Sequence, residues 1–211
     1  LRGLISPLAS ISGAAELLYA SGDINPRNQG LMNIITRECI RLQSTISDFL
    51  SFSKPMEPEK EFITLLPPVQ EMIQVLQHTL DWPQKCSSVV DIPEKMDCWA
   101  DPQQIHKVLL NLLHNSCIAL RNMEGEIHIS AREIEDDTGA EKTVITIADT
   151  GRGIPALIIN KIYEPFFTTR ENGTGLCLSI VHQIVKAHQG SITITSMKNQ
   201  GTTTEVCLPL P

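Results

Sequence analysis

The sequence contains no apolar run long enough to cross a membrane, no signal peptide and no extended basic segment. A membrane-spanning helix needs about 20 apolar residues, so any membrane-bound sensor region is expected upstream of this chain. The formal net charge is −7, and together with the lack of a basic run this argues against nucleic acid as the main partner.

Paired cysteines are also missing. The six cysteines are scattered along the chain and form no C-x-x-C pair. This pattern favours reduced thiols in a protein core over disulfides or a thiolate-bound metal ion. The chain is therefore expected to be cytoplasmic.

The composition that is present is that of a globular protein. Hydrophobic residues make up 42% and charged residues 19% of 211 residues, enough for one large domain or two small ones. An acidic surface does not exclude a phosphate ligand, because backbone N–H groups and a metal ion can hold one.

Residues 1–53 predict two amphipathic helices joined by a turn. Apolar residues recur at alternating spacings of four and three in both segments, the pattern of helices packed side by side at a shallow angle. Gly22 and Asp23 interrupt the pattern, and Asn25 and Pro26 restart it as N-cap and first helical residue. The apolar positions are Leu4, Leu8, Ile11, Ala15 and Leu18 in the first helix and Met32, Ile35, Cys39, Leu42, Ile46 and Phe49 in the second.

An antiparallel helical hairpin of this size buries little apolar surface by itself. We therefore expect two copies of the chain to form a four-helix bundle in a homodimer. Packing of the hairpin against the rest of its own chain is the alternative.

Residues 54–68 contain four prolines and several charges, and predict a hinge linker with a short strand near residues 62–65. Residues 69–211 alternate helices and strands, which predicts an α/β sandwich, a mixed sheet covered by helices. Asp101 is expected to cap the N-terminus of a helix over residues 103–121. Helices are expected at 69–80, 103–121 and 176–188, and strands at 87–92, 96–100, 126–133, 143–148, 191–196 and 202–208.

Three polar motifs interrupt the apolar pattern of this region. Asn111 and Asn115 share one face of the helix 103–121, with His114 beside them. An amide oxygen is a suitable ligand for Mg²⁺, although a solvated helix face explains such a pair equally well.

The second motif, residues 149–154, follows a strand directly. A carboxylate at Asp149 can accept the exocyclic amino group of adenine, and Gly151 and Gly153 allow close approach of a flat base. A plain turn is the alternative reading of the same residues. The third motif, residues 172–176, precedes a helix, where glycines expose N–H groups toward phosphates.

In this order and spacing, the segments NLLHN, DTGRGIP and EPFFTTRENGTGL resemble the N, G1, F and G2 boxes of sensor histidine kinases. LISPLASISGAAELL and ITRECIRLQSTISDFLSFSKP resemble the dimerisation and phosphotransfer hairpin of the same kinases, most closely those of the nitrogen-regulation type. The resemblance covers essentially the whole chain. It implies an α+β chain, with the hairpin followed by the GHKL (Bergerat) ATP-binding fold shared with gyrase-type topoisomerases, heat-shock chaperones and mismatch-repair ATPases.

The resemblance implies ATP and Mg²⁺ as cofactors and a response-regulator receiver domain as partner. By the match, Asn115 coordinates the metal, Asn111 supports the phosphate or metal shell, and Asp149 binds the adenine amino group. Phe166 and Phe167 belong to a lid, expected to be mobile without nucleotide and to order when it binds. The cofactor-binding residues implied by the match are Asn111, Asn115, Asp149, Gly151, Gly153, Phe167, Arg170, Gly173, Thr174, Gly175 and Leu176.

Two positions depart from the family pattern. Cys177 replaces the third glycine of the G2 box, which predicts weaker ATP binding. Arg2 stands where the phosphoacceptor histidine is expected, with Gly3 at the acidic position and Ser6 at the asparagine. A guanidinium has no free lone pair for attack on phosphorus.

Three explanations of Arg2 remain open: a degenerate kinase acting as a dimeric nucleotide-binding scaffold, a shifted motif with its histidine upstream of Leu1, or first residues that are not native. The sequence favours a degenerate or altered motif, because residues 7–18 match without a gap. Asn111 argues against an ATPase of the gyrase or mismatch-repair type, because such an enzyme would carry a glutamate at this position.

Overall fold

The computed structural model describes residues 11, 13, 15, 26–53, 57–78, 82–135, 138–170 and 173–211. Contacts between Cα atoms divide the chain into two units, Leu1–Lys54 and Pro55–Pro211. Each unit is described by itself.

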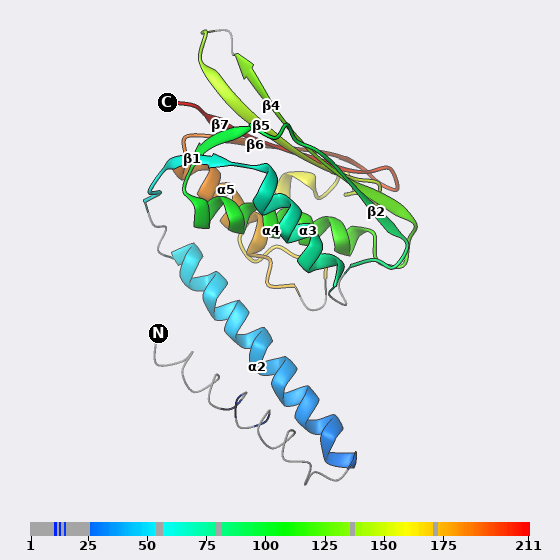
Figure 1. The fold of residues 1–211 in the computed structure, drawn as a ribbon. Helices are drawn as coiled ribbons and strands as arrows, with labels where there is room; N and C mark the ends of the chain where they lie inside the picture. Colours follow the sequence, from blue (N-terminus) through cyan, green and yellow to red (C-terminus); the bar gives the residue numbers. More distant parts are fainter. Residues whose placement is uncertain are drawn as a thin grey trace. The chain divides into compact units, whose positions relative to one another are not determined.

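The first unit has one long helix among its described residues, α2 (Pro26–Ser53; Figure 1). It begins at Pro26, as predicted, because the first N–H groups of a helix have no partner within it and proline loses nothing there. The other helix predicted for the hairpin lies outside the described residues apart from positions 11, 13 and 15, so the hairpin stays a prediction. Large apolar side chains are exposed on α2 within this unit: Leu31, Ile34, Ile35, Leu42 and Phe49.

The second unit is built on a five-stranded mixed sheet of order β2-β4-β5-β7-β6. The strands β2 and β4 run parallel, and the other neighbours are antiparallel. A separate two-stranded sheet pairs β1 with β3. The strands are β1 (Glu61–Thr64), β2 (Cys86–Asp91), β3 (Asp97–Ala100), β4 (Gly125–Glu135), β5 (Glu141–Asp149), β6 (Ser191–Met197) and β7 (Gly201–Pro209).

Helices α3 (Leu66–Gln77), α4 (Pro102–Ala119) and α5 (Cys177–Ala187) cover one face of this sheet (Figure 1), and a short 3-10 turn, η1 (Ile159–Lys161), precedes α5. Side chains alternate between the faces of a strand, so Ile145 and Ile147 of β5 share the helix-covered side and join the apolar core. The predicted α/β sandwich is confirmed for this unit.

The start of α3 differs from the sequence prediction. The helix was expected from Val69, but it begins at Leu66 and contains both Pro67 and Pro68 in its first turn. Proline is tolerated there because the first N–H groups of a helix have no intrahelical acceptor. Leu65 is fully buried, and its N–H donates to the Met96 carbonyl at 2.9 Å. The predicted linker 54–68 and domain 69–211 remain predictions.

The N-terminus of α4 is capped by Asp101, as predicted. Its Oδ1 accepts from the N–H groups of Gln103 and Gln104, each at 3.0 Å. Its Oδ2 accepts from the backbone N–H of Glu59, also at 3.0 Å. The cap therefore ties the segment before β1 to the start of α4.

His188 follows the last residue of α5 and is hydrogen-bonded to Asp101, the residue that caps α4. Its side chain is 1% exposed. The backbone N–H of Asp101 donates to Nε2 at 3.0 Å, so Nδ1 carries the proton and donates to the Ile184 carbonyl at 2.8 Å. The Lys60 ammonium donates to the His188 carbonyl at 3.2 Å. The four residues Glu59, Lys60, Asp101 and His188 are called the cap junction below.

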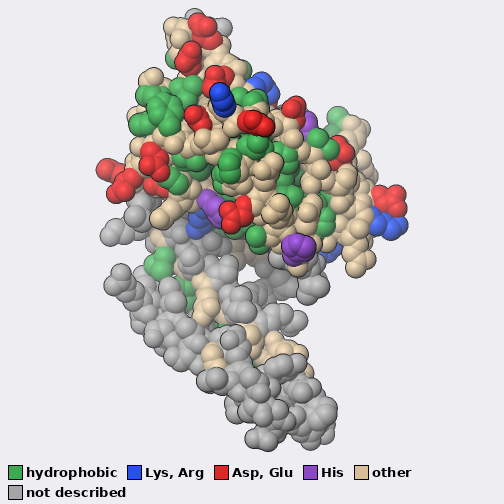
Figure 2. Space-filling view, viewed as in Figure 1, with side chains coloured by type: hydrophobic (Ala, Val, Ile, Leu, Met, Phe, Trp, Pro, Cys, Tyr) green, Lys and Arg blue, Asp and Glu red, His purple; other side chains and the backbone are tan. Residues whose placement is uncertain are grey.

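Acidic side chains are spread over the second unit on the face shown in Figure 2, with few basic ones among them. This agrees with the net charge of −7. No helix among the described residues is long and apolar enough to span a bilayer.

Candidate functional site

Asp149 ends β5 as a buried carboxylate that is 8% exposed. Its Oδ1 accepts from the Gly151 N–H at 2.9 Å, and its Oδ2 accepts from the Ser116 hydroxyl at 3.1 Å. Burial raises the pKa of this carboxyl group, and the hydrogen bonds from Gly151, Ser116 and the Thr202 N–H lower the pKa again in part. The strand end therefore holds an acid in an oriented, largely desolvated position.

Ser116 lies in the buried, mostly apolar stripe of α4 and was not among the predicted site residues. The structure shows that it is 4% exposed and bound to Asp149. The signal available in the sequence was a hydroxyl in an otherwise apolar stripe, because a buried hydroxyl needs a partner.

The glycines after Asp149 lie against the protein's own backbone. A Cβ at Gly151 would stand 2.8 Å from the Ala119 carbonyl carbon, and one at Gly153 would collide with the Met197 carbonyl oxygen. The Asn199 N–H donates to the Arg152 carbonyl at 2.7 Å. The expectation that these glycines admit a flat base is untested, whereas their packing against α4 and the β6–β7 turn is evident.

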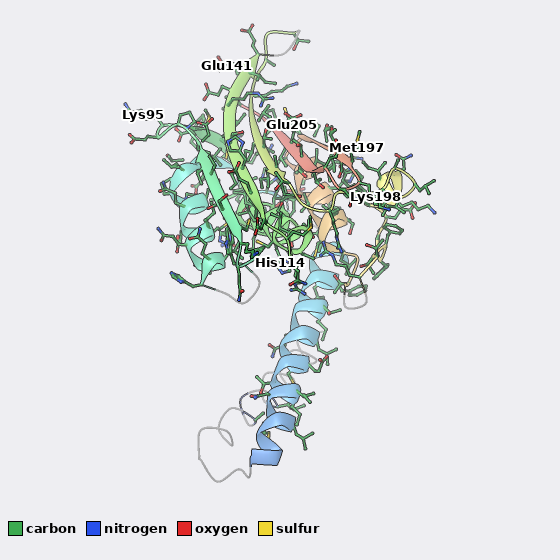
Figure 3. The ribbon with its side chains drawn as sticks, turned by 90° about the vertical axis from the view of Figure 1, so that its right-hand side faces the viewer. Lys95, His114, Glu141, Met197, Lys198 and Glu205 are labelled. Carbon is green, nitrogen blue, oxygen red and sulfur yellow. The ribbon has the colours of Figure 1, made fainter. Side chains whose placement is uncertain are left out.

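The two asparagines of α4 have different surroundings. Asn115 Oδ1 accepts from the Arg170 guanidinium Nη2 at 3.0 Å. The amide Nδ2 of Asn111 is buried and has no hydrogen-bond partner among the described residues. His114 is half-buried beside them, and it lies at the opposite end of the second unit from Glu141 (Figure 3).

The segment between the two glycine motifs turns sharply before it reaches α5. Phe166 has a positive φ of 67° and is 60% exposed, and its N–H donates to the Gly175 carbonyl at 3.0 Å. Gly175 has a φ of 68°, and a Cβ there would collide with the Phe166 backbone. A side chain at Gly175 is thus excluded twice, by its dihedral angle and by space.

Arg170 is fixed by a tight turn of its own. The Arg170 N–H donates to Thr168 Oγ1 at 3.1 Å, and the Gly173 N–H donates to the Arg170 carbonyl at 3.2 Å. Burial lowers the pKa of the Arg170 guanidinium, and the positive charges of Arg152 and Arg121 lower it further.

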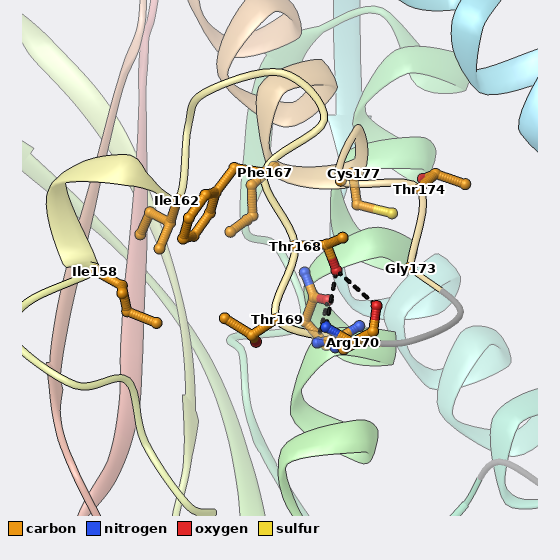
Figure 4. A pocket seen from close by; sticks show the side chains of 12 residues that line it. Ile158, Ile162, Phe167, Thr168, Thr169, Arg170, Gly173, Thr174 and Cys177 are labelled. Carbon is orange, nitrogen blue, oxygen red and sulfur yellow. Dashed lines mark hydrogen bonds between the residues drawn. The ribbon is translucent and has the colours of Figure 1, made fainter.

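A cavity of 140 Å³ lies between this segment, α4 and the start of α5 (Figure 4). Small-molecule sites commonly measure about 300–1,000 Å³, so the cavity as it stands is too small for a whole nucleotide. Its walls contain six of the predicted site residues: Asn115, Phe167, Arg170, Gly173, Thr174 and Gly175. Six further residues line it that the sequence did not assign to the binding set: Ile158, Ile162, Thr168, Thr169, Cys177 and Leu178.

Asp149 and Leu176 are predicted site residues that do not line the cavity. Asn115 lines the cavity and Ser116 binds Asp149, and these two are successive residues of α4. The Asp149 carboxylate and the cavity therefore lie on neighbouring sides of one helical turn. Leu176 is 1% exposed as the residue before α5. Arg2 lies outside the described residues.

The second unit matches a family of known proteins. The family model described as histidine kinase-, DNA gyrase B-, and HSP90-like ATPase matches residues 100–211. The signal transduction histidine-protein kinase AtoS of Escherichia coli K12 is 30% identical over 206 residues, which is 97% of this chain and 33% of AtoS. The sensor histidine kinase ZraS of the same strain is 30% identical over 208 residues, 97% of this chain and 43% of ZraS. The chain thus spans less than half the length of these relatives.

Solved structures show the same likeness. Histidine kinase ThkA, in complex with response regulator protein TrrA, has a TM-score of 0.67 and 25% identity, covering 99% of this chain and 59% of that chain. Full-length ShkA in complex with AMPPNP has a TM-score of 0.82 at 21% identity, covering 99% of this chain and 44% of that chain, and shows the shared fold. The family model matches more than half of this chain. The chain therefore belongs to the histidine kinase-, DNA gyrase B- and HSP90-like ATPases, within their sensor histidine kinase branch.

Proposed function

We propose that this chain is the catalytic part of a sensor histidine kinase, and that it binds ATP between α4, the turn after β5 and the start of α5. The observation that carries the proposal is the buried Asp149 carboxylate beside the cavity. A carboxylate has about four acceptor sites, and the three hydrogen bonds to Asp149 leave capacity for one more donor. The exocyclic amino group of adenine supplies such a donor.

The phosphates are proposed to lie at the cavity. The turn of Gly173, Thr174 and Gly175 leads into α5, and among the described residues no side chain caps this helix. A helix N-terminus attracts anions because its N–H groups and its dipole point toward them. The Arg170 guanidinium adds a full positive charge at the same place.

The buried Nδ2 of Asn111 fits the same proposal. A buried amide N–H group without an acceptor costs free energy comparable to a lost hydrogen bond, and a ligand oxygen near α4 would satisfy it. We propose that Asn111 donates to the phosphate or to ordered water beside it.

The predicted magnesium ligand is also compatible with the proposal. Only the oxygen of an amide coordinates Mg²⁺, and in Asn115 this oxygen already accepts a hydrogen bond from Arg170. The oxygen has two lone pairs, so Asn115 would hold a Mg²⁺ ion either beside this hydrogen bond or in its place, and the ion would neutralise charge on the phosphates.

Phosphoryl transfer requires a nucleophile, and the hairpin supplies none of the usual kind. The six histidines lie at position 78 or later, and residues 1–53 contain none. A second candidate function follows, a dimeric scaffold that binds ATP without phosphorylating itself at the usual place. In either case we propose a homodimer through the exposed apolar side chains of α2, and a receiver domain of a response regulator as partner.

Two measurements test the proposal. Calorimetric titration with the ATP analogue AMPPNP should show binding, and Asp149→Ala should weaken it roughly tenfold or more. Asp91→Ala, at the exposed end of the edge strand β2, is the matched control and should leave the affinity unchanged. Unchanged affinity in the Asp149 variant would refute the adenine assignment.

The second measurement uses γ-labelled ATP and asks for acid-labile, base-stable label on the protein. Label would identify an acceptor histidine outside residues 1–53 and support the kinase. Binding of the analogue without any label would mean that this chain binds the nucleotide but contains no phosphoacceptor of its own, and would favour the scaffold.

A further inference from the structure

β6 is the last strand on one side of the five-stranded sheet and pairs with β7. In an antiparallel pair, every second residue of a strand directs its N–H and C=O groups away from the neighbouring strand. Among the described residues, no backbone hydrogen bond joins residues 191–195 to a segment other than β7. The outer edge of β6 therefore presents backbone donors and acceptors that a further strand can bind.

The sequence of β6 does not protect this edge. Edge strands of soluble proteins commonly carry a charge, a proline or a bulge, each of which discourages pairing with another chain. Residues 191–197 read SITITSM, without charge or proline, and residues 192–195 are all β-branched, which favours strands. The pairing with β7 runs from Ser191 to Met197 without a bulge.

The strand at the opposite edge, β2, is protected by contrast. It ends on the charged residue Asp91. Gln77 of α3 donates to Ser88 Oγ at 3.2 Å, and Trp82 Nε1 donates to the Cys86 carbonyl at 3.3 Å. In the part of the chain that the structure describes, side chains thus cover one edge of the sheet and leave the edge at β6 open.

The open edge also exposes apolar surface. Ile192 and Ile194 lie on the helix-covered side of β6 and are only half-buried, whereas Val206, the partner of Ile192 on β7, is 1% exposed. The difference arises because no described strand lies beyond β6. A further strand would remove part of this apolar surface from water, which is favourable.

The last residues of β6 are in contact with the chain itself. The Ile154 N–H donates to Ser196 Oγ at 2.8 Å, and a Cβ at Gly153 would collide with the Met197 carbonyl oxygen. The open stretch is therefore residues 191–195, with Thr193 at its centre.

This stretch is complementary to itself. It reads Ser-Ile-Thr-Ile-Thr, so the pattern of isoleucine and hydroxyl residues is the same in both directions. A second, antiparallel copy centred on Thr193 would place Ile192 opposite Ile194 and Ser191 opposite Thr195. Cross-strand pairs of β-branched or hydroxyl residues stabilise a sheet, whereas like charges directly opposite destabilise it.

The negative charge of the chain does not oppose this pairing. Glu205 is the partner of Thr193 on β7, and its carboxylate is paired with Arg132 at 3.0 Å. In two paired copies the two Glu205 residues would lie three strand spacings apart, about 14 Å. This exceeds the distance of about 8 Å over which exposed charges interact at physiological salt.

We propose that β6 is a self-association surface, on which residues 191–195 of two copies of this chain pair antiparallel about a two-fold axis at Thr193. The pairing joins two sheets into one and is closed, because each copy uses the same edge. It does not depend on nucleotide binding, and it adds a second contact to the dimer proposed through α2. A contact this small is weak by itself, but it gains from the high effective concentration of copies that are already held together.

The test is disulfide cross-linking of the full chain under mild oxidation, followed on non-reducing gels. In Thr193→Cys the two introduced thiols would belong to directly opposite residues, whose Cα atoms lie about 4.5–5.5 Å apart in an antiparallel pair. This lies within the range of about 4.4–6.8 Å that a disulfide spans. Cys207 of β7 lies close to this edge, so it is replaced by serine in every variant.

Thr195→Cys is the matched control, because Thr195 is exposed on the same face of the same strand. In the proposed register its two copies are offset by four residues, about 14 Å, which no disulfide spans. We expect Thr193→Cys to form the cross-linked dimer at least about tenfold faster than Thr195→Cys. Similar rates for the two variants would overturn the inference: both slow would mean no pairing of β6 with a second copy, and both fast would mean another register or random collision.

A second experiment tests the register without a thiol at the axis. The double variant Ser191→Cys with Thr195→Cys should cross-link, since each cysteine meets the other one of the second copy. Adding Thr193→Lys places two like charges directly opposite and should slow this cross-linking at least about tenfold. The side chain of residue 193 is exposed, so circular dichroism should show an unchanged fold, and an unchanged cross-linking rate would refute the pairing. Titration with AMPPNP tests the nucleotide site separately, so either proposal can fail without the other.

Discussion

Replacing His188 tests the cap junction. His188→Leu removes both ring nitrogens and keeps a side chain of similar size. The backbone N–H of Asp101 then loses its acceptor at a place where the histidine is 1% exposed. The Ile184 carbonyl keeps a partner, because the His188 backbone N–H also donates to it, at 3.1 Å. The net loss is therefore one buried donor left without an acceptor.

An unpaired buried N–H group costs about 1–3 kcal/mol. We expect His188→Leu to lower the free energy of unfolding of the second unit by about 2 kcal/mol at neutral pH. His188→Gln provides an amide oxygen that can accept from Asp101, so its loss should be about 1 kcal/mol or less. The exposed His106 of α4 is the control, and His106→Gln should leave the free energy of unfolding unchanged.

The same residue makes the stability depend on pH. Burial lowers the pKa of His188 below its ordinary value of 6.5, and the charge of Lys60 lowers it further, while the Ile184 carbonyl and Asp101 raise it. As pH falls below 6.5, the unfolded chain gains a proton that the folded chain does not yet bind. The free energy of unfolding therefore falls with pH, by at most about 1.4 kcal/mol per pH unit for this one proton.

Both His188 variants should lose this dependence of the free energy of unfolding on pH, although only the leucine variant loses much stability at neutral pH. Asp149, with its raised pKa, titrates with the opposite sign, but it is present in all the chains and cancels in the comparison. Denaturant unfolding followed by tryptophan fluorescence reports the second unit alone, since the two tryptophans are Trp82 and Trp99. A leucine variant within about 0.5 kcal/mol of the wild type, or one with the wild-type acid slope, would refute the reasoning.

Three further predictions concern other parts of the chain. Gly175→Ala combines a positive φ with a collision against the Phe166 backbone, so thermal unfolding should show a loss of about 3 kcal/mol. The control Gly139→Ala has a positive φ, but its Cβ would meet only the Glu135 carboxylate at an ordinary contact distance of 3.5 Å. It should cost about 1 kcal/mol, and equal losses would contradict the packing argument. Leu42→Glu places a charge among the exposed apolar residues of α2 and should weaken the proposed dimer at least about tenfold in sedimentation equilibrium, whereas an unchanged dimer would remove α2 from the interface. Burial raises the pKa of the Cys98 thiol to about 12, so at pH 8 mass spectrometry should detect alkylation of Cys98 only after unfolding, and labelling of the folded chain would contradict its burial.

The sequence predicted the second unit well where the pattern is local. The alternation of β5 and the helical spacing of α4 follow from periodicities of two and 3.6 residues, and Asp101 carries its capping function in its own side chain. The start of α3 was missed because Pro67 and Pro68 indicate a linker and a first helical turn equally well.

Contacts between distant segments were beyond the sequence. Nothing local shows that Arg170 reaches Asn115, or that Ser116 orients Asp149, because both pairs form only when helix and sheet have packed. Gly151 could be recognised as a site of close approach, yet its neighbour in the structure is Ala119 of the chain itself. Residue types can be predicted in such cases, but their partners depend on the tertiary fold.

The cap junction has a mechanical consequence. Glu59 and Lys60 are hydrogen-bonded to residues at the ends of two helices of the second unit. One bond ends on the residue that caps α4, and the other on the residue that closes α5. Stiff helices carry a shift at one end to the other, about 27 Å away for the 18 residues of α4. Residues 59 and 60 are therefore tied to the start of the helix that carries Asn115 and to the end of the helix that follows Gly175.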